Sequence, residues 1–347
     1  MLQNDDIAEL LAREADSAKL PASKALRKAA RRAFLWPEEA ADLVERGGKL
    51  TELDRVGPYI ERLIRTWIDQ EVSVPEKPPI RSGFFTVPQA AKTIAQKPAW
   101  LKAIKGDLQM HTVWSDGEGS IKDMVDAALQ RKYSYIAITD HSKGLKIAGG
   151  IDESKLRGQS REIESLNDSL GGRFHILRSI ELNINPTGEG DMDSKALSQL
   201  DLVLGCFHSS LRKTDDQTER YLAALRNPDI QILGHPRGRI YNFRLGLTAD
   251  WHKVFALAAK LDKAVEIDSY PDRQDLSLDL VKIAKKEGCR ISLGTDSHGP
   301  SQLRFMAFGA ASLIKAGISR DRILNFMDAS ELLAWVKSVR EKPGARR

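Results

Sequence analysis

Five of the seven histidines in this sequence stand at or near the ends of short apolar runs that read as β-strands. Acidic residues occupy the same register, meaning positions at or near the ends of these runs, with Glu181 inside one run and Asp296 at the end of another. Imidazole and carboxylate groups together suit zinc, manganese or iron, and a bridging carboxylate holds two ions about 3.5 to 4 Å apart. The pattern predicts a centre of several divalent metal ions. The residues in register are His111, Asp116, Asp140, His141, Glu181, His208, His235, Asp296 and His298.

Other reactive side chains read as structural. His175 and His252 fall outside the register and are interpreted as surface or packing residues. Ser115 and Ser297 neighbour the candidate ligands, but a strand-to-helix G-x-S-x-G elbow is missing, so both are read as supporting or capping residues rather than nucleophiles. The two cysteines, Cys206 and Cys289, lie in apolar runs and cannot form a disulfide framework, which fits buried thiols in a reducing cytoplasm.

The elements that must position these residues are seven strand-like runs that alternate with amphipathic helical stretches from residue 106 onward. Such alternation predicts parallel strands with right-handed crossovers. A barrel of this kind carries its functional side chains at the carboxyl ends of its strands, where the register places them. The predicted strands lie within residues 106–112, 135–141, 174–184, 202–210, 230–236, 263–270 and 290–298.

The first part of the chain has a helical pattern of apolar residues. Helical periodicity over 4–11, 23–35, 37–44 and 58–68 predicts a small all-helical domain at residues 1–72. The text VPEKPP at 74–79 predicts an extended segment, because proline removes a donor and biases its predecessor away from the helix. We expect a linker at 73–103 and an α/β barrel domain at 104–340.

Long, ordered motifs in the barrel region resemble those of the PHP (polymerase and histidinol phosphatase) domain family, most closely the C-terminal PHP domain of bacterial family X DNA polymerases. The motifs are QMHTVWSDGEGS, YIAITDHSKGLKIAGGID, SIELNI, FHSS, ILGHPRGR, EIDSYPDRQDL and GTDSHG. The resemblance implies a distorted (β/α)7 barrel and a metal-dependent phosphoesterase, a hydrolase of phosphoric ester bonds.

The resemblance also implies three metal positions and a metal-activated water as the attacking group, with Asp140 orienting the site rather than binding metal. The first position is held by His111, Glu181 and Asp296, the second by Glu181, His208 and His235, and the third by Asp116, His141 and His298. Where many members have His-x-His on the first strand, this chain has Gln109, whose amide oxygen is a weaker ligand. Two or three ions (zinc, manganese or iron) are therefore expected.

Cations in the loops after the strands are candidates for binding a substrate phosphate. They are Lys143, Arg237, Arg239 and Arg273, each of which could equally be a solvated surface charge. Arg239 and Arg273 are favoured, because they match the pattern of the polymerase-associated domains.

The N-terminal segment is similar to the small helical domain that begins family X polymerases, and LTELDRVGPYIERLI resembles a helix-hairpin-helix. That motif binds the DNA backbone through hairpin amides. Of the two glycines of that motif, this sequence has one, Gly57. Arg55 occupies the other glycine position, which puts the hairpin geometry in question. A DNA-contacting patch is predicted at Lys24, Arg27, Lys28, Arg31, Arg32, Arg55 and Gly57, with a solvated helix face as the alternative.

A family X polymerase needs a palm domain between these regions, and fewer than forty residues separate Asp69 from Gly106. We therefore predict no nucleotidyl transfer, and Asp191 and Asp193 match an aspartate pair only superficially. A formal net charge of +5 is compatible with polyanionic partners but is far below that of a nucleic-acid-binding tail. No run of apolar residues is long enough to span a membrane, so a membrane partner is not expected.

Three functions remain open at this stage. The first is hydrolysis at nucleic-acid 3′ ends or of nucleotides, as a 3′-phosphatase, a 3′→5′ exonuclease or an abasic-site enzyme in DNA repair. The second is a small-molecule phosphatase for histidinol phosphate or a nucleoside bisphosphate, since a fold does not decide between substrates. The third is an inactive DNA-binding scaffold.

Overall fold

The computed structural model describes residues 1–342. Seven strand positions follow one another around a ring, each at a place where the sequence predicts a strand, and the third is split into two short strands. A three-stranded parallel sheet has the order β1-β2-β3, and a five-stranded parallel sheet has the order β4-β5-β6-β7-β8. The strands are β1 (Gly106–Asp107), β2 (Tyr135–Ile138), β3 (His175–Arg178), β4 (Glu181–Asn183), β5 (Leu204–Cys206), β6 (Ile232–Leu233), β7 (Ala264–Asp268) and β8 (Arg290–Gly294).

Backbone bonds join the two sheets at both edges. On one side Glu181 pairs with His141, and the Glu181 N–H donates to the Asp140 carbonyl at 3.1 Å. On the other side Met110 pairs with Ser297, and the His111 N–H donates to the Ser297 carbonyl at 2.7 Å. The ring is thereby closed, which makes the domain a distorted barrel of seven parallel strand positions, as expected.

Helices follow the strands and cover the outside of the ring. Their apolar residues recur at helical spacing and are buried against the strands, while their polar residues face outward. These helices are α7 (Ile121–Gln130), α8 (Glu153–Leu170), α9 (Ser194–Leu197), α10 (Thr218–Arg226), α11 (Trp251–Leu261), α12 (Leu278–Lys286) and α13 (Met306–Ala316), with α14 (Ala329–Glu341) as the last described helix. Short 3-10 segments stand at Lys146–Ala148, Pro300–Phe305, Arg320–Arg322 and Leu324–Phe326.

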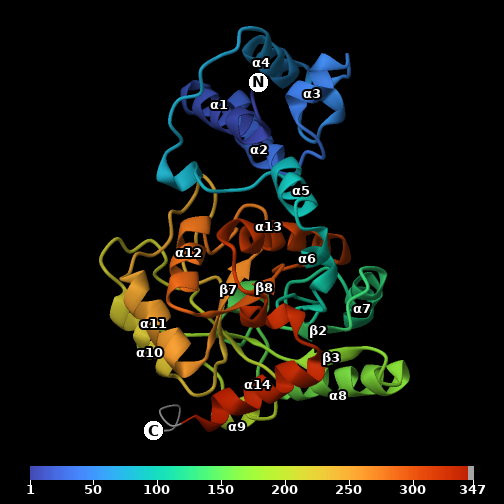
Figure 1. Ribbon diagram of the computed structural model, residues 1–347, viewed down its shortest axis with the longest axis vertical. Helices are drawn as coiled ribbons and strands as arrows, with labels where there is room; N and C mark the ends of the chain where they lie inside the picture. Colours follow the sequence, from blue (N-terminus) through green and yellow to red (C-terminus); the bar gives the residue numbers. More distant parts are fainter. Residues whose placement is uncertain (343–347) are drawn as a thin grey trace.

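The N-terminal helices lie at one end of the molecule, and α9 and α14 lie at the other (Figure 1). They are α1 (Asn4–Ser17), α2 (Ala22–Ala33), α3 (Ala40–Glu45) and α4 (Pro58–Asp69), with a 3-10 turn at Leu50–Glu52. Gln3 is the N-cap of α1, and the Asn4 side chain bonds to the Glu38 carbonyl and the Ala40 N–H at the start of α3.

The segment between the helical region and the barrel is partly helical. After an extended stretch and a 3-10 turn at Pro79–Arg81, it forms α5 (Val87–Ala95) and α6 (Pro98–Ala103). Both helices contact α13 of the barrel. Residues 87–103 therefore pack on the barrel rather than acting as a free spacer, and the exact division into domains stays a prediction.

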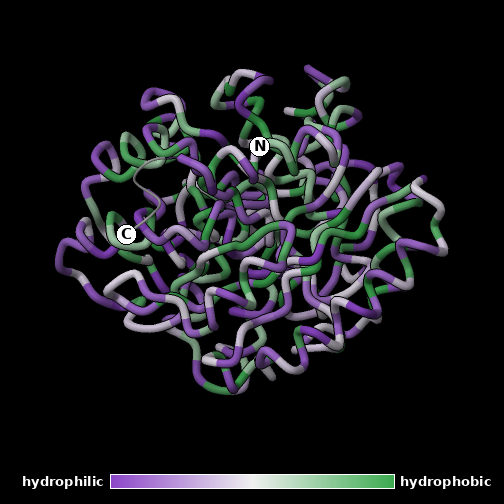
Figure 2. Tube along the Cα trace, turned by 90° about the horizontal axis from the view of Figure 1, so that it is seen from below, coloured by the Kyte–Doolittle hydropathy of each residue, from purple (hydrophilic) through white to green (hydrophobic). Residues whose placement is uncertain are grey.

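Apolar side chains gather in two main bodies, one around the barrel and one among the N-terminal helices. In Figure 2 hydrophobic segments concentrate inside the trace and hydrophilic segments around its outer loops. Tyr241, from the loop after β6, belongs to the helical core, where its ring packs against Phe34 at 4.7 Å and Phe84 at 5.4 Å between centroids. Across residues 1–342, none of the helices has the length and apolar character to cross a membrane.

Candidate metal centre

The buried carboxylate of Glu181, at the start of β4, is the point on which four histidines converge. His208 and His235 bring Nε2 to 2.8 and 2.7 Å from its Oε1 atom. His111 Nε2 and His141 Nδ1 lie 3.2 and 3.4 Å from its Oε2 atom. These five residues come from strands that are far apart in sequence, and the closed ring brings their carboxyl ends together.

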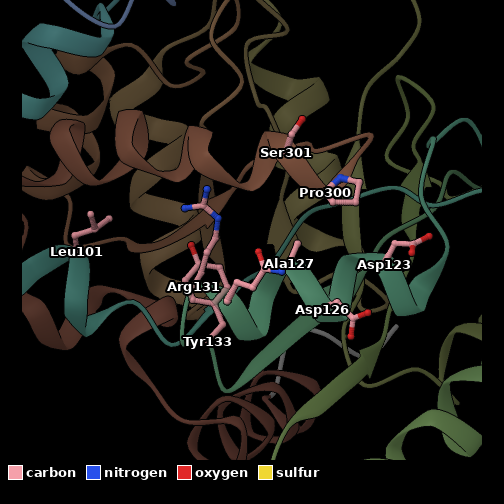
Figure 3. Close-up of a pocket in the computed structure, with 9 residues that line it drawn as sticks. Leu101, Asp123, Asp126, Ala127, Arg131, Tyr133, Pro300 and Ser301 are labelled. Atoms are coloured by element: carbon pink, nitrogen blue, oxygen red, sulfur yellow. The ribbon is translucent and has the colours of Figure 1, made fainter.

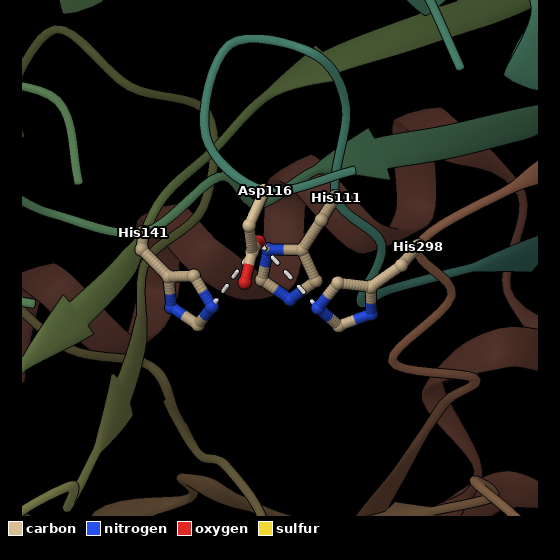
Figure 4. A group of neighbouring side chains, drawn as sticks. All are labelled: His111, Asp116, His141 and His298. Carbon is tan, nitrogen blue, oxygen red and sulfur yellow. Dashed lines mark ion pairs between the residues drawn. The ribbon is translucent and has the colours of Figure 1, made fainter. Parts of the chain in front are cut away.

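A second group gathers around Asp116, on the loop after β1 (Figure 4). His141 and His298 place Nε2 at 3.6 and 3.5 Å from Asp116 Oδ1, and His111 Nδ1 is 4.0 Å away. The His111 and His141 rings are stacked, with centroids 4.3 Å apart. His111 therefore lies between the two groups.

Asp140 holds the loop that carries Asp116. Its carboxylate accepts hydrogen bonds from the Thr112 N–H at 2.8 Å, the Ser115 hydroxyl at 2.5 Å and the Gln159 amide at 2.6 Å. A side chain on Gly117 would collide with the His111 backbone, so glycine is required where this loop returns to β1. Asp140 thus supports the loop, and its bond to Ser115 explains that serine as a structural residue.

Two residues of the centre have unusual backbones. His235 has φ 23° and Asp296 has φ 49°, in the left-handed region that residues with a side chain rarely adopt. Such strain costs of order 1 to 3 kcal/mol and persists where the surrounding structure enforces it. Asp296 is also fixed by contacts, with Oδ1 3.0 Å from His111 Nε2 and Oδ2 2.7 Å from Arg273 Nη1.

Gln109 is buried at the same point. Its Nε2 atom donates to Glu181 Oε2 at 3.2 Å, and its Oε1 atom has no hydrogen-bond partner. Both Gln109 and Glu266 lie close to Gly294, where an added side chain would meet them. The amide therefore stands among the candidate ligands, where the resemblance expects an imidazole in many members.

Electrostatics keep the central carboxylate ionised. Burial alone raises the pKa of Glu181, but the surrounding imidazoles, His141 and His235 foremost, hold that pKa well below its ordinary value. Burial lowers the pKa of His141 to about 3. The pKa of His235 is about 9, because its attraction to Glu181 outweighs burial.

The donors present fit divalent metal ions. Three buried polar atoms here have no hydrogen-bond partner among the described residues, namely Gln109 Oε1, His111 Nδ1 and His141 Nδ1. Buried polar atoms are normally paired, so an unpaired set on two histidines and an amide beside buried acids points to a bound cation. Groups able to hold an ion, with ligand atoms within 4.8 Å of one another, include His111 with Glu181 and Asp296, and Asp116 with His111, His141 and His298.

Of the predicted phosphate-binding cations, Arg273 is the one brought to the centre, through its contact with Asp296. Lys143 pairs with Glu153 at 2.6 Å, and Arg237 donates to the Leu247 carbonyl. Buried Arg239 stacks on Phe84 and donates to the Ser82 and Gly83 carbonyls. All four cations thus have partners within the protein and stay candidate phosphate contacts, with Arg273 the one that contacts a residue of the metal centre.

Three buried residues of the centre were not singled out as site residues from sequence. Cys206 lies within 4.8 Å of Glu181 and His235 ligand atoms. Glu266 and Asp268 are buried on β7, and burial raises the pKa of both carboxyls well above their ordinary value. Strand alternation could have found Cys206, because it precedes the predicted ligand His208 by two residues.

The predicted DNA-contacting cations lie mostly on one helix. Lys24, Arg27, Lys28, Arg31 and Arg32 are all exposed on α2, whose Leu26, Ala29, Ala30 and Ala33 are buried on the opposite face. Arg55 comes after the Leu50–Glu52 turn and has φ 65°, so it adopts the left-handed backbone expected of glycine there. Gly57 precedes α4 with an ordinary extended backbone.

Asp191 and Asp193 have structural partners of their own. The Asp191 carboxylate accepts from the Gly144 N–H, and Asp193 caps α9. Neither belongs to the groups described above as able to hold an ion.

The family model for the PHP domain matches residues 107–295, more than half of the chain. The chain belongs to the PHP domain family. The match runs from the second residue of β1 to the residue after β8.

Similar proteins include a polymerase and several phosphatases. "DNA polymerase/3'-5' exonuclease PolX" of Bacillus subtilis is 35% identical over 238 residues, which is 68% of this chain and 42% of that protein. The chain therefore spans less than half of that relative. A probable phosphatase of Thermoanaerobacter sp. is 26% identical over 69% of this chain and 96% of its own length.

Among solved structures, a histidinol phosphate phosphatase from Lactococcus lactis, complexed with zinc, L-histidinol and phosphate, aligns with a TM-score of 0.45 at 18% identity. The alignment covers 62% of this chain and 95% of that one.

Proposed function

We propose that this PHP-domain phosphoesterase uses the centre described above to act on phosphate esters at nucleic-acid 3′ ends or on nucleotides. The observation that carries the proposal is the convergence of five histidines on Glu181 and Asp116, with Arg273 beside Asp296. The similarity to a polymerase and exonuclease, together with exposed cations on α2, favours nucleic acid as the substrate.

The proposal assigns the metal-holding role to nine residues: Gln109, His111, Asp116, His141, Glu181, His208, His235, Asp296 and His298. Divalent ions held there would supply Lewis acidity toward phosphoryl oxygens and lower the pKa of water. Glu181 keeps the imidazoles gathered, Asp140 fixes the loop of Asp116, and Arg273 offers guanidinium N–H groups to a phosphate oxygen. Zinc, manganese and iron all suit this donor set. The two cysteines are free and buried, which is compatible with the reducing cytoplasm that we propose as the location.

A second candidate is a small-molecule phosphatase. It is favoured by two relatives that are named as probable phosphatases, of which this chain matches 96% and 77% of the length. Both candidates use the same centre, so only substrates separate them.

The deciding experiment is a substrate comparison with the purified chain and added Mn²⁺ or Zn²⁺. We expect the 3′-phosphate of an oligonucleotide to be removed with a higher kcat/KM than the phosphates of histidinol phosphate or a nucleoside bisphosphate. A clear preference for either small molecule would replace the first candidate by the second. If the metal-bound protein hydrolyses none of the three substrates, the result would favour the third reading, an inactive DNA-binding scaffold.

A further inference from the structure

A groove of about 450 Å³ lies where the helical region meets the barrel. One wall comes from α2 and the turn before α4, and the other from the loops after β7 and β8. Five cations line it, namely Lys28, Arg31, Arg32, Arg55 and Arg304. Asp272 is the one acid in its lining among residues 1–342.

Much of this positive charge is uncompensated. Asp54 lies 3.2 Å from Arg32 and 3.7 Å from Arg55. Within the described part of the chain, Lys28, Arg31 and Arg304 form no ion pair with an acid. A groove with this excess of unpaired cations attracts an extended polyanion.

Two residues of the groove lining are linked to the metal centre by direct neighbours. Asp272 precedes Arg273, whose guanidinium contacts Asp296. Gln302, also in the lining, accepts a hydrogen bond from the His298 N–H at 2.8 Å. A ligand lying in the groove would therefore lie beside the loops that carry Asp296 and His298.

One partly exposed aromatic ring belongs to the lining. Half-buried Tyr270 packs edge-on against the buried ring of Phe305 at 5.3 Å between centroids, so Tyr270 is the ring that a base could contact. Cations along a groove together with an aromatic ring are the combination that binds single-stranded nucleic acid. The volume is that of a small-ligand pocket, which suits one or two nucleotides of one strand rather than a duplex.

The larger hollow beside α7, of about 740 Å³, has a different character (Figure 3). Its lining includes Asp123 and Asp126 against a single arginine, Arg131. That balance of charge does not suit a polyanion.

We propose that the groove between α2 and the loops after β7 and β8 binds the sugar-phosphate backbone of a single nucleic-acid strand whose 3′ end lies in the metal centre. The inference rests on the proposed function, because that function places the strand end. It adds a binding track that joins the helical region to the barrel and selects substrates with more than one phosphate.

The test is a binding titration with the full chain. The probe is a fluorescent single-stranded DNA of about 12 nucleotides that ends in an inverted thymidine and so resists cleavage, beside an RNA of the same sequence. The variant Lys28→Ala/Arg31→Ala is expected to raise Kd about tenfold near 0.1 M salt and to make the slope of log affinity against log salt less steep by about 1 to 2. Both side chains are exposed and alanine favours the helix, so the fold is retained.

The matched control is Lys155→Ala/Arg161→Ala, which removes two exposed cations from α8. It is expected to bind like the wild type. Equal losses in both variants would overturn the groove, because the effect would then depend on net charge alone.

Hydrolysis of thymidine 3′-monophosphate by the same wild-type preparation separates this inference from the proposed function. Turnover without oligonucleotide binding overturns the groove and leaves a phosphatase. Binding that depends on Lys28 and Arg31 without turnover supports the groove and removes the proposed hydrolysis. RNA binding at least as tight as DNA binding would support the track and assign it to RNA.

Discussion

Gln109 stands where the resemblance leads us to expect a second imidazole on the first strand. Its Nε2 atom donates to Glu181, and an amide oxygen is a weaker ligand than an imidazole nitrogen. The position that Gln109 shares with His111 and Asp296 is therefore the one at which we expect metal to be held least tightly. Glu266 beneath it keeps an unpaired Oε1 atom.

We predict that Gln109→His increases the metal retained per chain, because it adds a nitrogen donor beside Glu181. Metal content measured by mass spectrometry after gel filtration checks this, with a gain of about one ion expected. Gln199→His, at an exposed position after α9, serves as the control and should retain no extra metal. A Gln109→His content equal to that of the control would show that the position does not bind metal.

At the scale of elements, the loop after β6 ties the barrel to the helical region. Tyr241 in this loop is 1% exposed, packs on Phe34 and Phe84, and donates its N–H to the Asp272 carbonyl at 2.7 Å. Asp272 lines the groove. The contact therefore holds both walls of the groove in one arrangement.

Tyr241→Ala is expected to lower the free energy of unfolding by about 3 kcal/mol, the usual cost of removing a buried aromatic ring. Denaturant titration followed by circular dichroism measures it. Tyr59→Ala, at a ring that is 42% exposed, should change the free energy by less than about 0.5 kcal/mol. Similar values for the two variants would mean that the loop does not anchor the helical region.

Sequence periodicity located the barrel elements well, because alternation and turn residues are local signals. All seven predicted strand positions are confirmed, although β1 and β6 are only two residues long. The split of the third strand into β3 and β4 was not predicted. It arises because β3 pairs with β2 in one sheet while β4 pairs with β5 in the other, and such long-range pairing is not a local signal. The packing of α5 and α6 on α13 was also missed, because the prolines near residue 78 signal extended chain but carry no information about the helices after them.

Whole-molecule geometry explains which site predictions could be made. Parallel strands that end on one face of a barrel bring distant histidines together. Their positions at strand ends were therefore enough to predict one shared site for His111, His141, His208, His235 and His298. Partners of long flexible cations depend on packing that no local pattern encodes, and Arg239 accordingly lies against Phe84. The groove exists because α2 packs over the barrel loops, and this packing could not be predicted from the sequence.

The most direct test of the account is the metal-dependent hydrolysis of a 3′-phosphorylated oligonucleotide by the wild type, His235→Ala and His175→Ala. His235 contacts Glu181 at 2.7 Å, whereas His175 is exposed at the start of β3. We predict that His235→Ala loses bound metal and at least about 100-fold in kcat, while His175→Ala keeps both. Full activity of His235→Ala, or equal losses in the two variants, would contradict a catalytic metal centre at this site.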